Sequence, residues 1–252
     1  MRKVSRRKLV TGGLAATAGV AGFGVAARLA EKYGLVPPDH RGIYGIGETL
    51  TYGFQRLLTR HSLAREFPRT LISKLPLAND TAPPNETYMR LRAGGFADWR
   101  LTVDGMVARP ASFSLAELKS HPTRSQITQL ACEEGWSYIA EWIGVPLSHV
   151  LQLVGVHPQA RYVVYFSIEP DWWDSIDMAE ALHPQTLLVH AMNGGDLSAG
   201  SGGPVRMRVP RQLGYKSVKY ITRLTVTDNL KKFGKGLGSA SPEGGYAWYA
   251  GI

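Results

Sequence analysis

Alternating hydrophobic and polar positions predict a series of β-strands from residue 99 onward. The alternation in 99–103 ends at Asp104-Gly105, a dipeptide typical of a hairpin turn, so we expect a second strand through Val107. Apolar runs rich in valine, tyrosine and phenylalanine are typical of buried strands. On these patterns the remaining strands are expected at 127–131, 161–168, 186–192, 205–209 and 216–227.

Three other segments have the pattern of helices. Apolar residues of 50–58 fall on one helical face, and we expect this helix to lie across the main body. The sequence Ser114-Leu-Ala-Glu117 matches a capping box, which predicts a short helix that begins there and ends before Pro122. Pro146 is expected to start a third helix, with the apolar residues of 147–154 on one side.

Short helices among strands of mixed length predict an α+β fold rather than a doubly wound sheet. Prolines at 76, 83 and 84 interrupt the chain before the strands begin. We therefore expect an N-terminal segment at 1–30, a linking helical segment at 31–88 and one main domain at 89–252.

The net charge of the chain gives little support for a nucleic-acid partner. The formal charge is +9 over 252 residues, but five of the positive residues lie within the first eight, and about +4 remains without them. The rest of the chain has no long lysine- and arginine-rich run with interleaved aromatic residues. We expect no nucleic-acid binding.

The N-terminal sequence has the character of a targeting segment. Ser5-Arg-Arg-Lys-Leu-Val10 leads into an uncharged stretch at 9–27 that is rich in alanine, glycine and valine. This arrangement resembles a twin-arginine export signal, so we expect a periplasmic protein. The alternative is a membrane anchor, because nineteen uncharged residues approach the roughly 20 that span a bilayer.

Cys132 is the only cysteine of the chain and follows the strand predicted at 127–131. An internal disulfide and a metal cage made of several thiolates from this chain are therefore excluded. Three interpretations remain from the residue itself: a buried bystander, a nucleophile, or one sulfur ligand to a metal whose other ligands come from a cofactor.

Several pieces of the chain, taken in order, resemble the catalytic domain of the sulfite oxidase family of molybdopterin-dependent oxidoreductases. The resemblance extends from Trp99 to about Asp228 and implies an α+β fold of the sulfite oxidase type, with mixed sheets and short helices. The matching pieces are Trp99-Arg-Leu-Thr-Val-Asp-Gly105, the strand ending in Cys132, Trp142-Ile-Gly-Val-Pro-Leu147, Met192-Asn-Gly194, Gly202-Gly-Pro-Val-Arg206 and Gly214-Tyr-Lys-Ser-Val-Lys219.

The resemblance implies a molybdopterin cofactor with molybdenum, to which Cys132 is the protein ligand. A thiolate is a soft donor that suits such a metal beside the dithiolene sulfurs of the pterin. The family's cofactor-phosphate region corresponds to Arg206, Lys216, Ser217 and Lys219, and a looser match places Arg90 among the cofactor contacts. The alternative for these cations is a solvated basic strand edge. The alternation in 205–209 also places Arg206 and Arg208 on the face opposite the core.

The chain departs from sulfite oxidase around both of its candidate catalytic residues. Glu133 and Glu134 follow the cysteine where sulfite oxidase has an asparagine turn and anion-holding arginines, and these carboxylates would repel sulfite if they face the pocket. His190 occupies the place of the family's active-site tyrosine and is a candidate proton donor, with a hydrogen-bonded core histidine as the alternative. Ser201 replaces a family histidine before the Gly-x-Pro-x-Arg stretch.

These features together predict a monomeric, exported enzyme that transfers an oxygen atom with two electrons and reduces an S-oxide or N-oxide of small size. Oxidation of sulfite or another small sulfur compound is the alternative reaction, and a non-catalytic cofactor- or partner-binding protein is the alternative class. The chain carries no haem-binding Cys-x-x-Cys-His, so we expect an external cytochrome or membrane electron carrier. The aromatic and acidic residues of 171–177 are interpreted either as a pocket rim or docking face, or as a capped turn before a short helix.

Overall fold

The computed structural model of the chain describes residues 30, 34–40, 45–78, 83 and 85–252. The N-terminal segment predicted at 1–30 lies outside this part of the chain, apart from Ala30. Among the described residues, no helix is both long enough and apolar enough to cross a membrane.

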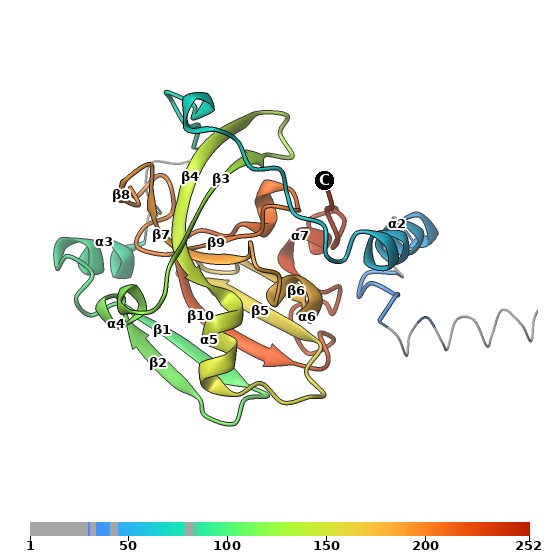
Figure 1. Cartoon of the computed structure of the whole chain (residues 1–252). Helices are drawn as coiled ribbons and strands as arrows, with labels where there is room; N and C mark the ends of the chain where they lie inside the picture. The colour runs from blue at the N-terminus through green and yellow to red at the C-terminus, as the bar shows by residue number, and fades with distance from the viewer. Residues whose placement is uncertain (1–29, 31–33, 41–44, 79–82, 84) are drawn as a thin grey trace, which may run out of the picture.

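Ten strands and several short helices make up the described part of the chain (Figure 1). The strands are β1 Arg100–Gly105, β2 Ala111–Ser114, β3 Arg124–Ala131, β4 Ser137–Pro146, β5 Tyr162–Ser167, β6 Trp173–Asp177, β7 Leu187–Met192, β8 Gly195–Asp196, β9 Arg206–Arg208 and β10 Ile221–Thr227. The α-helices are α2 Gly45–Leu58, α3 Glu86–Ala93, α4 Leu115–Ser120, α5 Leu147–Val154, α6 Met178–Ala181 and α7 Ala240–Glu243, and the 3₁₀ helices are η1 Arg69–Leu71 and η2 Gly214–Lys216.

The strands form two five-stranded sheets, one mixed and one antiparallel. One sheet has the order β2-β1-β10-β5-β6, and the other has the order β3-β4-β7-β8, with β9 also paired to β7. Only β1 and β10 pair in parallel, and the remaining pairs among the described strands are antiparallel. The architecture is therefore α+β, as the sequence predicts.

The main core lies between the two sheets and is closed by α5. Val103 of β1, Val163 of β5 and Leu188 of β7 belong to this cluster, together with apolar residues of β9 and β10. The helix predicted after Pro146 is confirmed, and its residues Leu147, Val150, Leu151 and Val154 are buried against the core. Burial of side chains of this size contributes about 1.5–3 kcal/mol each, so this cluster is the main source of stability.

Two other local predictions are confirmed. Ser114 and Glu117 form the complete capping box at the start of α4, and the helix ends at Ser120, before Pro122. The strand expected at 127–131 is the second half of β3, and it leads directly to Cys132. The predicted strands at 161–168 and 186–192 are β5 and β7.

The strand boundaries after Asp104 and Lys216 differ from the prediction. Gly105 does not turn the chain into a two-residue hairpin. It pairs with Val226 of β10, where a Cβ atom would overlap the Val226 carbonyl, and β2 begins only at Ala111. The strand predicted at 216–227 begins five residues late, because Lys216 ends η2 and Tyr220 has a positive φ of 57°.

The helix predicted at 50–58 exists as α2, but its buried face is the polar one. Glu48, Tyr52 and Arg56 are buried at successive i, i+4 positions, whereas Leu50 and Phe54 are 68% and 61% exposed. Arg56 forms ion pairs with Asp177, at 2.6 Å from Nε to Oδ2, and with Glu180, at 3.1 Å from Nη1 to Oε2. These buried charges, together with the packing of the Tyr52 ring against Trp248 and Tyr249, attach α2 to the domain.

Candidate functional site

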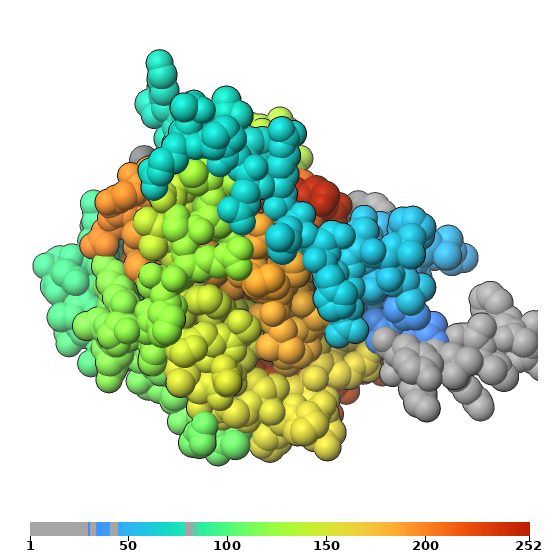
Figure 2. All heavy atoms as spheres, viewed as in Figure 1, coloured from blue at the N-terminus to red at the C-terminus, as the bar shows by residue number. Residues whose placement is uncertain are grey.

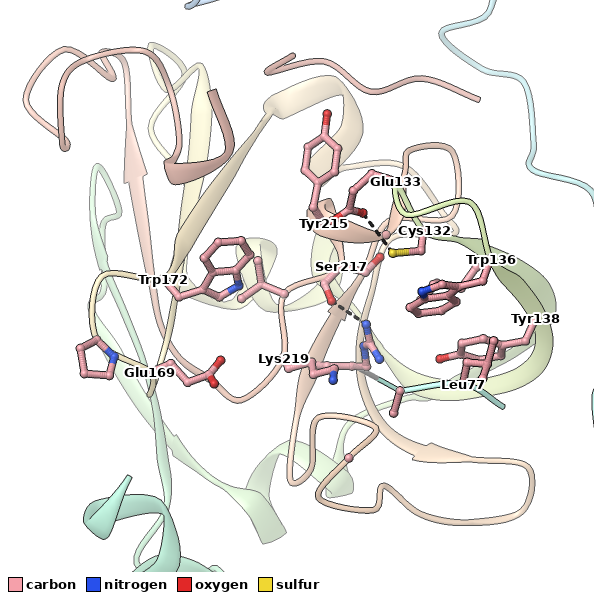
Figure 3. A pocket seen from close by; sticks show the side chains of 17 residues that line it. Leu77, Cys132, Glu133, Trp136, Tyr138, Glu169, Trp172, Tyr215, Ser217 and Lys219 are labelled. Atoms are coloured by element: carbon pink, nitrogen blue, oxygen red, sulfur yellow. Dashed lines mark hydrogen bonds between the residues drawn. The ribbon is translucent and has the colours of Figure 1, made fainter. Parts of the chain in front are cut away.

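A cavity of about 430 Å³ opens where the end of β3, the loop after η2 and the loop between β5 and β6 meet. Its size is in the range of small-ligand and cofactor sites. Figure 3 shows Trp172 and Glu169 across the cavity from Trp136 and Tyr138, with Cys132 in the wall between them. The lining residues used below are Cys132, Glu133, Trp136, Tyr138, Glu169, Trp172, Arg206, Gly214, Tyr215, Ser217 and Lys219.

Strand alternation brings the Cys132 side chain to this cavity. Leu130 of β3 is buried and lines the cavity, and Cys132, two residues later, projects to the same side. A tight turn follows, in which the Cys132 amide donates to the Trp136 carbonyl at 2.8 Å and Gly135 has a φ of 93°. The sequence therefore places the one thiol of the chain at the wall of a ligand-sized cavity.

The surroundings of Cys132 disfavour a free thiolate. Its Sγ lies 3.4 Å from Glu133 Oε2 and 3.8 Å from Glu134 Oε2, and the residue is 8% exposed. Burial first, and then the two carboxylates, raise the pKa of the thiol to about 11. A thiolate at this position needs a nearby cation to stabilise its charge, and a bound metal ion is one way to provide that cation. No cluster of three or more His, Cys, Asp or Glu suited to a metal exists among the described residues, so a metal at Cys132 must bring other ligands with it.

Two arginines of β9, at the edge of the cavity, both lie against one indole. The guanidinium carbons of Arg206 and Arg208 lie 5.3 Å and 5.1 Å from the centre of the Trp142 ring. Arg206 lines the cavity and donates to the carbonyls of Ser201 and Ser217 at 2.9 Å and 2.7 Å. Arg208 lies behind it and donates to the Gln129 carbonyl at 2.6 Å.

These two positive charges are buried without a counter-ion. Arg206 is 4% exposed, Arg208 is fully buried, and neither forms an ion pair with a carboxylate of the described residues. The Nε atoms of both side chains also have no hydrogen-bond partner there. Burial lowers the pKa of Arg206, and burial together with the charge of Arg206 lowers the pKa of Arg208 to about 9. Since burying an unpaired charge is costly, this end of the cavity is suited to an anion.

The loop after η2 completes this end of the cavity. Ser217 accepts from the Val209 amide at 3.1 Å through its Oγ, which fixes its side chain beside the arginines. Lys219 is half-buried and lines the cavity. A Cβ atom on Gly202 would lie 2.9 Å from the side chain of Lys219 and 3.2 Å from that of Arg206, so only glycine leaves both cations in place.

Three predicted site residues do not line the cavity. Lys216 is fully buried in an ion pair with Asp174, at 2.6 Å from Nζ to Oδ1. Arg90 is exposed on α3. The alternative of a solvated basic strand edge is wrong for Arg206 and for Lys216, because both are buried.

His190 is the third predicted site residue that does not line the cavity. Val189, its neighbour in β7, packs in the cluster of Trp142 and Tyr138 on the cavity side, whereas Leu188 packs in the main core. His190 itself is the extra residue of a β-bulge between the pairs Ile143–Ala191 and Gly144–Val189, and it is not among the residues that line the cavity. The charges of Lys119 in α4 and Asp196 in β8 affect its pKa. Burial lowers its pKa, and neither ring nitrogen has a hydrogen-bond partner among the described residues.

Arg208, Tyr138 and Glu169 were not predicted as site residues. The segment 171–177 has both of its proposed roles, because exposed Trp172 lines the cavity while Asp177 caps α6. Tyr138 could have been found from its period-two spacing with Ala140 and Trp142. Glu169 carries no local signal of this kind.

Comparisons with known proteins agree with the fold and with the chemistry of the cavity. Residues 89–233 match the family model described as the oxidoreductase molybdopterin binding domain. The sulfane dehydrogenase SoxCD from Paracoccus pantotrophus aligns with a TM-score of 0.51 and 25% identity, over 53% of this chain and 39% of that chain.

Two curated relatives carry sulfoxide reductase names. The chain is 38% identical over 197 residues to the provisionally named protein-methionine-sulfoxide reductase subunit YedZ1 of Azospira oryzae, which covers 77% of this chain and 70% of that protein. It is 34% identical over 145 residues to MsrP, the protein-methionine-sulfoxide reductase catalytic subunit of Ralstonia nicotianae, which covers 52% of this chain and 44% of that protein.

The residues of the cavity fit a cofactor that is anionic at one end and carries a metal at the other. Arg206 and Arg208, which have no carboxylate partner among the described residues, and the space left by Gly202 beside them suit a phosphate. The single thiol of Cys132 suits a metal that already has ligands of its own. The resemblance to the sulfite oxidase family predicted from the sequence is confirmed. The chain belongs to the molybdopterin-binding oxidoreductase domain family and is a molybdenum-dependent enzyme that uses molybdopterin.

Proposed function

We propose that the chain reduces the sulfoxide of a methionine side chain, free or in a peptide, with electrons from a separate carrier. The reaction takes up two electrons and two protons, releases the oxygen as water and leaves a thioether. Bound molybdopterin would supply a metal that changes its oxidation state by two electrons. The names of both curated relatives support this substrate class.

Five residues of this chain would hold the cofactor. Cys132 would bind the metal, and Arg206, Ser217 and Lys219 would bind the anionic end, with Arg208 adding positive charge from behind. The observation that carries this assignment is the pair of buried arginines without a carboxylate partner in the same cavity as the one thiol.

The carboxylates that line the cavity favour a neutral substrate over a small anion, while the arginine end would be taken by the cofactor. Glu133 and Glu169 lie among the lining residues, and Glu133 is within 3.4 Å of the cysteine sulfur. These carboxylates would repel sulfite, whereas a sulfoxide carries no net charge. Trp136, Tyr138 and Trp172 form aromatic walls, against which the thioether and methylene groups of methionine would pack.

Electron supply and cellular location extend this proposal. The paired arginines and the uncharged stretch at 9–27 support export by the twin-arginine route, with anchoring of the same segment as the alternative. A periplasmic or membrane cytochrome is the kind of carrier that we expect. Stopped-flow mixing of the oxidised enzyme with reduced candidate cytochromes tests this, and an enzyme that none of them reduces, although a reduced viologen does, would contradict it.

Metal analysis of Cys132→Ser, beside wild-type chain and a Ser137→Ala control, tests the cofactor assignment. All three are produced in a host that makes the cofactor. We expect one molybdenum per chain in the wild type and in the control, where the exposed hydroxyl of Ser137 contacts Gln129, and a changed metal-centre spectrum in Cys132→Ser. An unchanged spectrum in Cys132→Ser would refute metal binding by this thiol.

Steady-state assays then separate the two reactions. Reduction of methionine sulfoxide with a reduced viologen is expected to exceed the oxidation of sulfite with ferricyanide. A larger kcat/KM for sulfite would refute the proposed direction and favour oxidation of a small sulfur compound, even if the metal assignment holds.

A further inference from the structure

Helix α2 presents a continuous apolar face away from the domain. Ile46, Leu50, Phe54, Leu57 and Leu58 follow one another along this face and are 61–80% exposed. At 1.5 Å per residue the stripe is about 18 Å long. Isolated apolar side chains on a surface are ordinary, but a contiguous stripe marks an interaction surface. Figures 1 and 2 show α2 at the edge of the molecule, on the opposite side from α3.

The orientation of the helix is fixed by its other face. Tyr52 Oη donates to Asp177 Oδ2 at 2.6 Å, Arg56 pairs with the carboxylates of Asp177 and Glu180, and Glu48 Oε1 accepts from the Tyr249 amide at 2.7 Å. Turning the helix to bury its leucines would expose or break these buried contacts. The apolar face is therefore held outward by specific interactions.

The charges around this face suit an anionic surface. Between residues 45 and 65 the only acidic residue is Glu48, and it is 6% exposed on the docked face. Arg60, His61 and Arg65 follow the helix and are exposed. The next carboxylate, Glu66, pairs with Arg124 at 3.7 Å. The exposed surface of 45–65 thus combines apolar and basic side chains and has no carboxylate.

We infer that α2 binds the surface of an anionic phospholipid bilayer, with its apolar face in the interface and the basic residues against the headgroups. An outward apolar stripe beside positive charge is the arrangement of helices that lie in a membrane interface. A bilayer accounts for the basic residues, which a purely apolar groove of a protein partner would not need. The sequence before the helix has a similar composition, basic at 2–8 and uncharged at 9–27.

Vesicle binding of the full, cofactor-loaded chain tests this inference, and it requires no turnover. The variant Leu50→Glu/Phe54→Glu changes two exposed positions, and Gln159→Glu is a control for added negative charge at an exposed site elsewhere. With vesicles containing phosphatidylglycerol we expect the double variant to bind at least tenfold more weakly than wild type, because burial of one such side chain is worth roughly tenfold. Vesicles of phosphatidylcholine alone should bind all three proteins more weakly.

Equal binding of wild type and double variant would overturn the inference, since the N-terminal segment or another surface would then account for the interaction. Dimers of wild type that dissociate in the double variant, seen by sedimentation velocity without lipid, would overturn it in favour of a second copy. A Phe54→Trp variant provides a direct measurement. Brominated acyl chains should quench the added fluorescence relative to wild type, and absence of this quenching would also overturn the inference.

Discussion

Replacement of Lys216 by methionine distinguishes a structural role from cofactor binding. Its ammonium lies 2.6 Å from Asp174 Oδ1 and 3.0 Å from the Ser175 carbonyl, and both charged side chains are fully buried. Asp174 also accepts from the Ser175 amide and the Ser241 hydroxyl, at 2.6 Å and 2.9 Å. Without Lys216, the Asp174 carboxylate would keep two neutral donors but have no cation beside it.

The expected loss follows from this geometry. Removing one partner of a buried ion pair costs about 3–5 kcal/mol. For a chain of this size, 1 kcal/mol changes the melting temperature by roughly 2–4 °C, so Lys216→Met should melt about 6–20 °C lower. The double variant Lys216→Met/Asp174→Asn should recover most of this loss, because asparagine keeps an acceptor for the amide and carries no charge.

Thermal or urea unfolding of cofactor-free and cofactor-loaded protein provides the measurement. Lys219→Met is the matched control, since this lysine lines the cavity and should lose molybdenum with little loss of stability in the cofactor-free state. If cofactor-free Lys216→Met unfolds within about 0.5 kcal/mol of wild type and binds less molybdenum, Lys216 has the cofactor role predicted from the sequence and our reasoning is wrong. A double variant no more stable than the single one would also refute it.

Three further predictions concern the cavity, α2 and β7. Arg206→Met should retain cofactor roughly tenfold or more weakly, because hydrogen bonds to charged groups contribute about 1.5–3 kcal/mol, and an unchanged molybdenum content after extensive dialysis would contradict this. Burial and the charge of Asp39 raise the pKa of Glu48 to about 7. Because the folded state then holds the proton of Glu48 more tightly than the unfolded state, the free energy of unfolding should fall as pH rises from about 4.5 to 7. Glu48→Gln should reduce that fall by about 1–3 kcal/mol in urea unfolding at several pH values, whereas an identical pH dependence would show that Glu48 does not titrate in this range. His190→Asn should change kcat by less than the roughly 100-fold loss that removal of a positioned proton donor causes, and a loss of that size would restore its predicted catalytic role.

Local patterns predicted the parts of the fold that depend on neighbouring residues. The capping box at Ser114, the helix after Pro146 and the strand before Cys132 are each specified within a few residues, and each is confirmed. The position of Cys132 at a cavity also follows from this strand. Family resemblance, rather than any pattern, connected that thiol with a metal cofactor.

The features that local patterns did not show depend on parts of the chain that are distant in sequence. Arg56 is 124 residues from Glu180, so no local pattern shows that α2 docks through its charged face. Lys216 has its partner 42 residues earlier, in β6. His190 lies in a strand that is buried on both faces, where alternation indicates two faces but not which one borders the cavity.

Strand β6 connects the two surfaces for which we propose a function. Asp174, near its start, pairs with Lys216, whose neighbours Tyr215 and Ser217 line the cavity. Asp177, at its end, binds Tyr52 and Arg56 of α2. The carboxylates lie three residues apart in one strand, so the cavity wall and the outward face of α2 are attached to the same element. The buried pairs Asp174–Lys216 and Asp177–Arg56 cannot be read from local sequence patterns. They set both the shape of the cofactor end of the cavity and the direction of the apolar face of α2.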